Sequence, residues 1–332
     1  MSKKSYFGVN GVARNVKSWP VGIGNVARKA KSGYFGVGGV ARQFLSGIDP
    51  VLNNNDWATI RAVSDANQGA NYWSVGDTKT ITINGKVGNT TFSNLSVDAF
   101  ILGFDHNSSV EGSNRIHFQI GKISGNLIGL IDGSYGNYKT DGSKIFNMNH
   151  WGNYNYGGWA GCDLRYDILG STDVAPSGYG SAVTTSRVGY NASATCATNP
   201  VANTLMAALP ANLRAVMKGV TKYADAVGNG SDVAANVKAF TDYLFLLAEF
   251  EVQGTHSYAN QYEQNYQKQY AYYSSGNSKV MYRHSATGST AWWWLRSAFC
   301  YDDSGFCGVY TDGSADLSLA GGACALAPGF VV

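Results

Sequence analysis

The sequence predicts an α+β fold that is rich in strands and long loops. The 332 residues include 41 Gly and 21 Tyr but only six Pro, which favours a loop-rich β protein over a helical enzyme. Apolar residues alternate with His117 and Gln119 over residues 116–120, as in a half-buried strand. Residues 205–220 repeat their apolar side chains with a helical period instead. Strands and helices are therefore both expected.

A short arm over residues 1–47 consists of three copies of a 14-residue, Gly-rich unit. Each copy has an apolar pair, a turn and a second apolar strand, which predicts a β-hairpin. The turns fall at Asn10-Gly11, Gly24-Asn25 and Gly38-Gly39. Because a single hairpin is marginally stable in water, the units should need stacking, oligomerisation or a partner.

Charge separates this arm from the rest of the chain. Residues 1–44 hold eight Lys and Arg and no acidic residue, so the remaining residues carry a net charge of −5 within a total of +3. Phosphate contacts with nucleic acid are a disfavoured use for such an arm, which could equally dock onto an acidic protein surface or keep the chain soluble. The Gly-x-Gly-x-x-Ala strings at 22–27 and 36–41 recur with the repeat and lack the acidic residue of a dinucleotide site, so no nucleotide is expected.

Local signals divide the larger domain, residues 48–332, into elements. Asn55-Asp56 predicts the cap of a helix that ends near Ala66. Asn199-Pro200 opens the helical stretch, and Pro210 is expected to start a second helix at its first position. Strands are predicted at residues 79–83, 99–104, 115–120 and 243–248.

Catalytic and metal-binding patterns do not emerge from the sequence. The histidines are dispersed without metal-ligand spacing, and a surface or strand-face position is favoured for each: His106, His117, His150, His256 and His284. Asp302-Asp303 fits paired carboxylates or a calcium site less well than an exposed loop. The five cysteines lack a C-x-x-C pair and are expected to be free thiols, with Cys307 in a buried strand. We therefore expect no enzyme, no cofactor and no metal.

The composition of the C-terminal tail is unusual. Residues 297–332 contain no Lys, Glu, Gln, Met or Trp, although the chain has 40 of these and a proportional share would be about four. The codons of these five amino acids end only in a purine, so their joint absence suggests a third base held to a pyrimidine. Targeted diversification of a template leaves such a trace. A chance fluctuation in a Gly- and Ala-rich tail is the alternative.

Several blocks of the sequence carry a resemblance. They lie at residues 71–77, 157–159, 209–210, 242–247, 269–273, 291–297, 306–309, 312–315 and 327–330. Over residues 55 to 332 the chain resembles an uncharacterised domain family common in prophages of gut bacteria, which is similar to the C-type lectin-like variable proteins of diversity-generating retroelements. The resemblance implies a C-type lectin-like domain, with an irregular antiparallel sheet, two helices and long loops, and a variable region at 297–326.

The same resemblance implies a function in a phage virion. The chain would be a tail-fibre or tail-tip receptor-binding or adhesion protein that binds a host-cell surface protein or glycan. Its arm would dock onto other tail or baseplate proteins, and a homo-oligomer, such as the trimer of related variable proteins, would add avidity. The protein would be made in the bacterial cytoplasm and localise to the virion. No membrane insertion is expected, since no apolar stretch reaches the roughly 18 residues required.

Three alternatives stay open. The first is a bacterial surface adhesin or lectin, and the second is a structural virion component whose C-terminus packs on its neighbours. A third is an oxidoreductase similar to formylglycine-generating enzymes, with Cys300 and Cys307 as the reactive pair. A reactive thiol needs nearby cations, whereas the chain after Arg296 has four Asp and no Lys or Arg. Calcium-dependent sugar binding is disfavoured as well, because neither Glu-Pro-Asn nor Trp-Asn-Asp occurs.

The ligand is expected to contact residues that interrupt the family-like framework of the tail. We call these eleven residues the ligand face: Phe299, Cys300, Tyr301, Asp302, Asp303, Tyr310, Thr311, Asp316, Leu317, Ser318 and Leu319. Alternation along a strand puts Trp292, Trp294 and Arg296 on one side, where they are expected to floor the face or pack a neighbouring loop. Trp293 and Leu295 are predicted to be buried on the other. The four Asp of the tail favour a cationic or hydrogen-bond-donating ligand.

Overall fold

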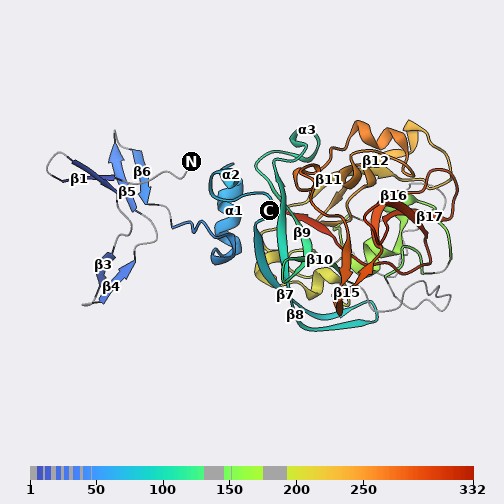
Figure 1. Ribbon diagram of the computed structural model, residues 1–332, viewed down its shortest axis with the longest axis horizontal. Helices are drawn as coiled ribbons and strands as arrows, with labels where there is room; N and C mark the ends of the chain where they lie inside the picture. Colours follow the sequence, from blue (N-terminus) through green and yellow to red (C-terminus); the bar gives the residue numbers. More distant parts are fainter. Residues whose placement is uncertain are drawn as a thin grey trace.

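Strands dominate the fold, which combines several sheets with short helices (Figure 1). The computed structural model describes residues 47–130, 146–150, 152–174 and 193–332, and the backbone of six strands between residues 6 and 45. The predicted α+β class is confirmed. Within the described residues, no helix is long and apolar enough to cross a membrane.

Three antiparallel hairpins form the arm, and each pairs only within its own 14-residue unit. Their strands are β1 (Tyr6–Val9), β2 (Val12–Asn15), β3 (Pro20–Ile23), β4 (Val26–Lys29), β5 (Gly33–Val37) and β6 (Val40–Leu45). The innermost pairs are Val9 with Val12, Ile23 with Val26, and Val37 with Val40. The predicted turn dipeptides lie between these pairs in the sequence, outside the described residues.

An eight-stranded sheet forms the centre of the domain. Its strands are β7 (Thr78–Val87), β8 (Thr90–Phe104), β9 (Ile116–Ile123), β10 (Asn126–Gly129), β13 (Leu244–Phe245), β14 (Met281–Arg283), β15 (Ala286–Ala291) and β19 (Gly329–Val331). β9 has β8 along one edge and β19 and β10 along the other. The end of the chain thus lies inside the sheet, where Ile116 and Val332 exchange two backbone hydrogen bonds of 3.1 Å.

The helix α1 (Trp57–Asp65) forms where its cap predicts it. The carboxylate of Asp56 accepts a 2.7 Å hydrogen bond from the amide of Thr59, which satisfies a donor that the first helical turn leaves unpaired. Trp57 then packs edge-on against Phe118 and Phe330, with ring centroids 5.6 and 5.8 Å apart. This contact fastens α1 to the central strands.

The other helices are one or two turns long. They are η1 (Leu52–Asn54), α2 (Gly69–Tyr72), α3 (Ser108–Glu111), α4 (Gly158–Gly161), η2 (Leu164–Leu169), α5 (Leu205–Ala208), α6 (Ala211–Arg214), η3 (Ala234–Asn236), α7 (Glu249–Gln253), η4 (Gln261–Asn265) and α8 (Ala271–Ser274). Helices this short have little stability of their own, so tertiary packing must hold them.

The prediction that β9 is half-buried is wrong. His117 and Gln119 are fully buried, like the apolar residues between which they alternate. Two apolar clusters explain this, since Phe118 belongs to one and Phe100 and Val331 belong to the other. The apolar and polar side chains of β9 therefore alternate between two buried faces of the strand. On the polar face, Gln119 donates to the carbonyl of Ala327 at 2.9 Å and accepts from the Tyr273 hydroxyl at 2.6 Å.

Two further predictions need correction. Residues 205–220 form only α5 and α6, with Pro210 as the residue before α6, and Val220 begins the strand β11 (Val220–Asp225). The predicted strand at 243–248 shrinks to β13, although its apolar residues are buried. In both segments the buried side chains were predicted well. The secondary structure differs from the prediction because tertiary contacts, and not the local sequence pattern, determine it.

Two smaller sheets complete the domain. β11 pairs with β12 (Val237–Asp242), and a three-stranded sheet is formed by β16 (Trp293–Ala298), β17 (Gly305–Val309) and β18 (Ala315–Leu319). In Figure 1 the chain enters the domain beside α1, while β16 and β17 lie toward the opposite end of the long axis. The predicted ligand face is therefore carried at that opposite end.

Candidate ligand-binding face

The three-stranded sheet gives the tail a fixed backbone. β17 pairs antiparallel with both neighbours, Trp294 opposite Gly308 and Cys307 opposite Leu317, which leaves β18 as the edge strand. The turn between β17 and β18 is closed by a 2.9 Å hydrogen bond from the amide of Tyr310 to the carbonyl of Ser314. Side chains of β18 and its turn thus stand on a sheet edge.

A single buried side chain holds the loop between β16 and β17. The Nδ2 of Asn155 donates to the carbonyl oxygens of Phe299, Asp302 and Gly305 at 3.0, 3.1 and 2.9 Å. Its backbone amide also donates to the carbonyl of Asp303 at 2.8 Å. Asn155 is fully buried, and such an asparagine rigidifies the loop because one side chain holds three of its carbonyl groups in place. No local pattern in the sequence indicates this role, since the partners are 144 to 150 positions away.

Ten of the eleven ligand-face residues reach solvent. Tyr301, Leu319 and Tyr310 are exposed by 64, 47 and 37%, and Asp302 is exposed as well. Those of intermediate exposure are Phe299, Asp303, Thr311, Asp316, Leu317 and Ser318. The prediction for Cys300 needs correction, because this thiol is only 3% exposed and lies beneath the loop.

Trp292 and the strand β16 pack beneath the ligand face. Trp292 is half-buried and packs edge-on against Tyr310, with ring centroids 4.8 Å apart. Trp294 is fully buried, and its indole N–H donates to the carbonyl of Phe146 at 2.8 Å, so it packs a neighbouring loop. Trp293 and Leu295 are buried in the second apolar cluster, as predicted. Only Trp292 of the three scaffold residues can touch a ligand.

A pocket opens beside the edge strand. It has a volume of about 470 Å³ and is lined by Arg283, Thr290, Trp292, Thr311, Ser318, Ala323 and Cys324. Two of these residues, Thr311 and Ser318, belong to the ligand face, and Trp292 belongs to its scaffold. An aromatic wall with a few hydroxyl groups is typical of small-ligand sites of this size. Residues chosen from sequence thus converge on one cavity.

An ion-pair network lies inside the domain and was not predicted. Arg296 donates to both carboxylate oxygens of Glu251 at 2.5 and 2.8 Å. Lys222 bridges Glu251 and Glu111 at 3.0 and 2.7 Å. Burial alone would raise the pKa of Glu251, but the cations Arg296 and Lys222 outweigh it and hold that pKa below its ordinary value. Arg296 therefore stabilises the interior of the domain and is not part of a binding surface.

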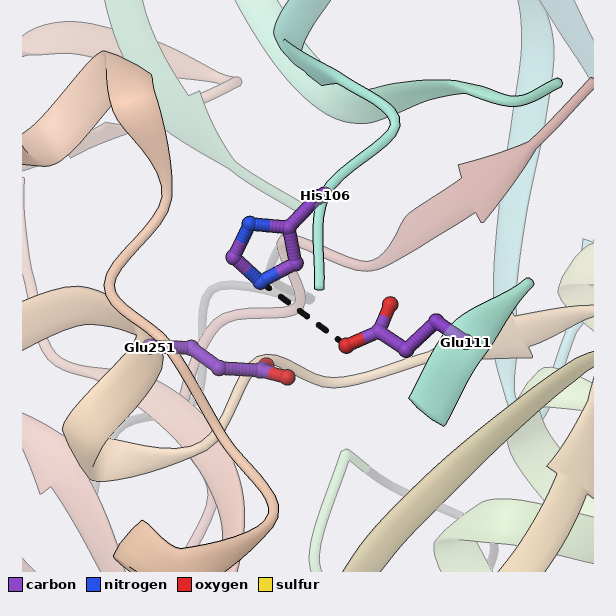
Figure 2. A group of neighbouring side chains, drawn as sticks. All are labelled: His106, Glu111 and Glu251. Atoms are coloured by element: carbon purple, nitrogen blue, oxygen red, sulfur yellow. Dashed lines mark ion pairs between the residues drawn. The ribbon is translucent and has the colours of Figure 1, made fainter. Parts of the chain in front are cut away.

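Three members of this region lie close enough to suggest a metal site. Ligand atoms of His106, Glu111 and Glu251 are within 4.8 Å of one another, and the His106 Nε2 is 3.8 Å from Glu111 (Figure 2). Burial lowers the pKa of His106 to about 3, so the imidazole is neutral at pH 7. Both carboxylates are already paired with Lys222 or Arg296, so a dication would have to displace these cations. The arrangement fits a structural network better than a metal centre.

Three of the histidines do not lie where the sequence predicted them. His106, His117 and His150 are buried, with exposures of 8, 0 and 3%, so the surface interpretation is wrong for these three. His106 stacks on Tyr270 with ring centroids 3.7 Å apart, and the His117 Nδ1 lies 3.2 Å from the Tyr270 hydroxyl. Their polar atoms face other buried polar groups, which composition alone does not reveal.

The cysteines are free thiols, as expected, and Cys307 lies on the buried strand β17. All five cysteines are free and buried. Burial raises the pKa of Cys300 to about 12 and that of Cys307 far above its ordinary value. A thiol with such a pKa is almost wholly protonated at pH 7, so it is a poor nucleophile.

Comparison with known proteins places the chain in a family. Residues 142–332, more than half of the chain, match the family described as Domain of unknown function (DUF6273), and the chain belongs to it. The matched part is shorter than the 55–332 resemblance, but it contains the whole ligand face, the pocket and Asn155. No curated protein matches the chain. No solved structure matches it either.

Proposed function

We propose that this chain is a receptor-binding or adhesion protein of a phage virion, which holds a host-cell surface ligand at its ligand face. The observation that carries the proposal is the 470 Å³ pocket, because Trp292, Thr311 and Ser318 all line it. Thr311 and Ser318 belong to the ligand face that the tail sequence predicts, and Trp292 belongs to its scaffold. A fixed backbone with variable, solvent-reaching side chains is what a diversified binding site requires.

The rest of the proposal concerns the fold and the arm. The domain would be a C-type lectin-like fold, in which β16–β18 and the loops around them form the variable region at 297–326. The basic hairpins would dock onto other tail or baseplate proteins, and an oligomer would multiply weak contacts into avidity. In Figure 1 the β16–β17 end lies away from the end where the chain enters the domain, which suits display of the face to a host.

Two alternatives differ in their observable consequences. A structural virion component would use the same face against neighbouring subunits, so virions lacking this chain would still adsorb normally. A bacterial adhesin would be encoded away from tail genes. The buried, protonated thiols Cys300 and Cys307 weigh against an oxidoreductase.

The test uses the full chain, labelled with a fluorophore, on a panel of intact gut-bacterial cells. Flow cytometry should show saturable binding to at least one strain. Replacing Tyr301, Tyr310 and Asp316 with Ala should lower that binding by more than about tenfold, because exposed aromatic anchors dominate interfaces. A matched triple variant at exposed positions elsewhere, Val51→Ala, Thr82→Ala and Lys86→Ala, should bind like the wild type.

Circular dichroism and thermal melting should show that both triple variants fold. Wild-type levels of binding by the folded Tyr301, Tyr310 and Asp316 variant would contradict the assigned face. Absence of binding to every strain by the wild-type chain would contradict the receptor-binding function itself.

A further inference from the structure

Two tyrosines outside the predicted variable region lie beside the ligand face. Tyr154 and Tyr156 are exposed by 51 and 42%, and their rings stack nearly parallel, with centroids 5.3 Å apart and planes 8° apart. Each large ring therefore presents apolar area to water, and the pair presents it in one fixed arrangement. Aromatic rings held in this way are typical of interaction surfaces.

The tyrosines and the β16–β17 loop form one unit. The hydroxyl of Tyr156 donates to the carboxylate of Asp303 at 2.5 Å. Asn155, which lies between the two tyrosines in sequence, holds the same loop through its three side-chain hydrogen bonds. The rings and the carboxylates are thus positioned together before any partner arrives.

The loops around this unit carry aspartate side chains and hence negative charge. A third loop approaches it, since a Cβ at Gly230 would lie 3.0 Å from the Cα of Asp302. The loop segments 152–157, 229–233 and 299–304 contain Asp232, Asp302 and Asp303 but no Lys or Arg. Within the described part of the chain, the hydrogen-bond partners of these carboxylates are neutral groups of Gln261, Ser304 and Tyr156. Their charge is available to an outside cation.

We infer that Tyr154, Tyr156, Asp302 and Asp303 form a second contact area, the tyrosine–aspartate patch, which binds arginine side chains of a protein partner. A guanidinium group stacks on a tyrosine ring and donates hydrogen bonds in its own plane to a carboxylate. The patch supplies both kinds of group side by side. This inference rests on the proposed function and names a protein as the class of ligand.

The patch and the pocket are separate parts of one surface. The loop with Asp302 and Asp303 precedes β17, whereas the turn with Thr311 follows it. The four residue steps of β17 span roughly 13 Å, since a strand rises about 3.3 Å per residue. The pocket itself reaches from Thr311 at the far end of β17 to Ser318, which pairs with Phe306 near the loop, so a protein partner is large enough to contact the patch and the pocket together.

The test uses the full chain and an acetylated, amidated Arg-Gly-Arg-Gly-Arg peptide. Calorimetric titration at low ionic strength should show saturable binding, and the same peptide with citrulline in place of arginine should not bind. Replacing both Tyr154 and Tyr156 with Ala should weaken binding about tenfold, from the loss of two exposed cation–π contacts. Replacing both Asp302 and Asp303 with Asn should weaken it about fivefold.

Tyr266→Ala is the matched control, because Tyr266 is also exposed and also stacks on a neighbour, Tyr223, with centroids 4.2 Å apart. Residues 261–270 around it contain Lys268 and no aspartate, and its loss should leave peptide affinity unchanged. Equal binding of the citrulline peptide, or unchanged affinity in the patch variants, would overturn the inference. So would maltose binding at the patch in place of the peptide, which would indicate a glycan ligand.

The two proposals fail separately. If the wild-type chain binds cells through Tyr301, Tyr310 and Asp316 but no peptide binds, the receptor-binding function stands and the arginine patch is overturned. If the peptide binds at the patch but no cell strain is bound, the patch stands as a cation site and the receptor-binding function is contradicted.

Discussion

Arg296 and Glu251 are both fully buried and form a bidentate ion pair, with N–O distances of 2.5 and 2.8 Å. The pair joins β16, which lies under the ligand face, to α7. Lys222 of β11 binds the same carboxylate, so three elements meet at one glutamate. A binding surface on short strands needs such internal support, because its loops alone do not fix the geometry.

Breaking this pair should strongly destabilise the domain. Arg296→Met leaves the Glu251 carboxylate buried with one cation fewer, and removing one partner of a buried pair costs about 3–5 kcal/mol. Denaturant titration measures the free energy of unfolding. The control is Arg61→Ala, which removes a partly exposed pair with Asp65 at 2.8 Å and a hydrogen bond to the carbonyl of Val216, and should cost about 1–2 kcal/mol. Equal losses in the two variants would show that burial does not govern the Arg296 pair.

Asn155→Ala should loosen the β16–β17 loop while the domain stays folded. The substitution leaves the carbonyls of Phe299, Asp302 and Gly305 without their shared donor, and unpaired buried polar groups cost about 1–3 kcal/mol. Hydrogen exchange should rise in residues 299–305 more than elsewhere. Asn71→Ala removes an exposed hydrogen bond to Gln68 and should leave that loop unchanged. Equal loop exchange in the two variants would contradict the role of Asn155.

The arm, α1 and burial of the apolar segments were predictable because their signals are local. Asp56 caps the helix that follows it, and each hairpin of the arm pairs two strands that are adjacent in the sequence. The supports of the ligand face were not predictable in this way. Asn155 acts on Gly305, and Glu251 acts on Arg296, across 150 and 45 positions. Such pairs leave no period or spacing in the sequence, so buried polar residues such as His117 were placed at the surface.

Stability should depend on the buried carboxyl of Glu263. Burial raises its pKa to about 7 from an ordinary 4.5, against hydrogen bonds from Ser297 and Gln267. Between pH 4.5 and 7 the unfolded chain ionises this group while the folded chain keeps the proton. The free energy of unfolding therefore falls as pH rises, by up to about 1.4 kcal/mol per pH unit from this group.

Glu263→Gln isolates that dependence. Other groups act in the opposite direction, such as His106, whose pKa is lowered to about 3 by burial and which adds stability as pH rises from 3 to 6.5. The difference in unfolding free energy between the variant and the wild type removes their shared effect. That difference should shift in favour of the variant from pH 4.5 to 7. A difference that is constant with pH would show that Glu263 is ionised in the folded chain.

The thiols should resist alkylation in the folded protein. Burial raises the pKa of Cys300 and of Cys324 to about 12, and all five cysteines are buried. Iodoacetamide at pH 7 should therefore leave the native chain unmodified by mass spectrometry, and should modify all five cysteines in guanidinium chloride. Rapid alkylation of Cys300 in the native chain would favour the oxidoreductase alternative.

Filling the pocket should block the ligand without unfolding the domain. Ser318 lies on the edge strand β18 at intermediate exposure, and its side chain borders the 470 Å³ cavity. Ser318→Phe would occupy space that a ligand needs. The next residue on the edge strand, Leu319, faces solvent and can be replaced by a larger side chain without filling the pocket. Binding of the labelled chain to its bacterial strain should fall by more than about tenfold, the loss expected when a central contact pocket is closed.

Ser318→Ala is the matched control for this substitution, and Leu319→Phe compares the pocket with another part of the ligand face. The first removes only the hydroxyl and should weaken binding about two- to tenfold, the range for one hydrogen bond. The second adds the same ring at the adjacent exposed position, outside the residues that line the pocket. If Leu319→Phe blocks binding as fully as Ser318→Phe, the ligand contacts the edge of the sheet rather than the pocket. If neither variant weakens binding while both melt like the wild type, this end of the sheet does not contact the ligand.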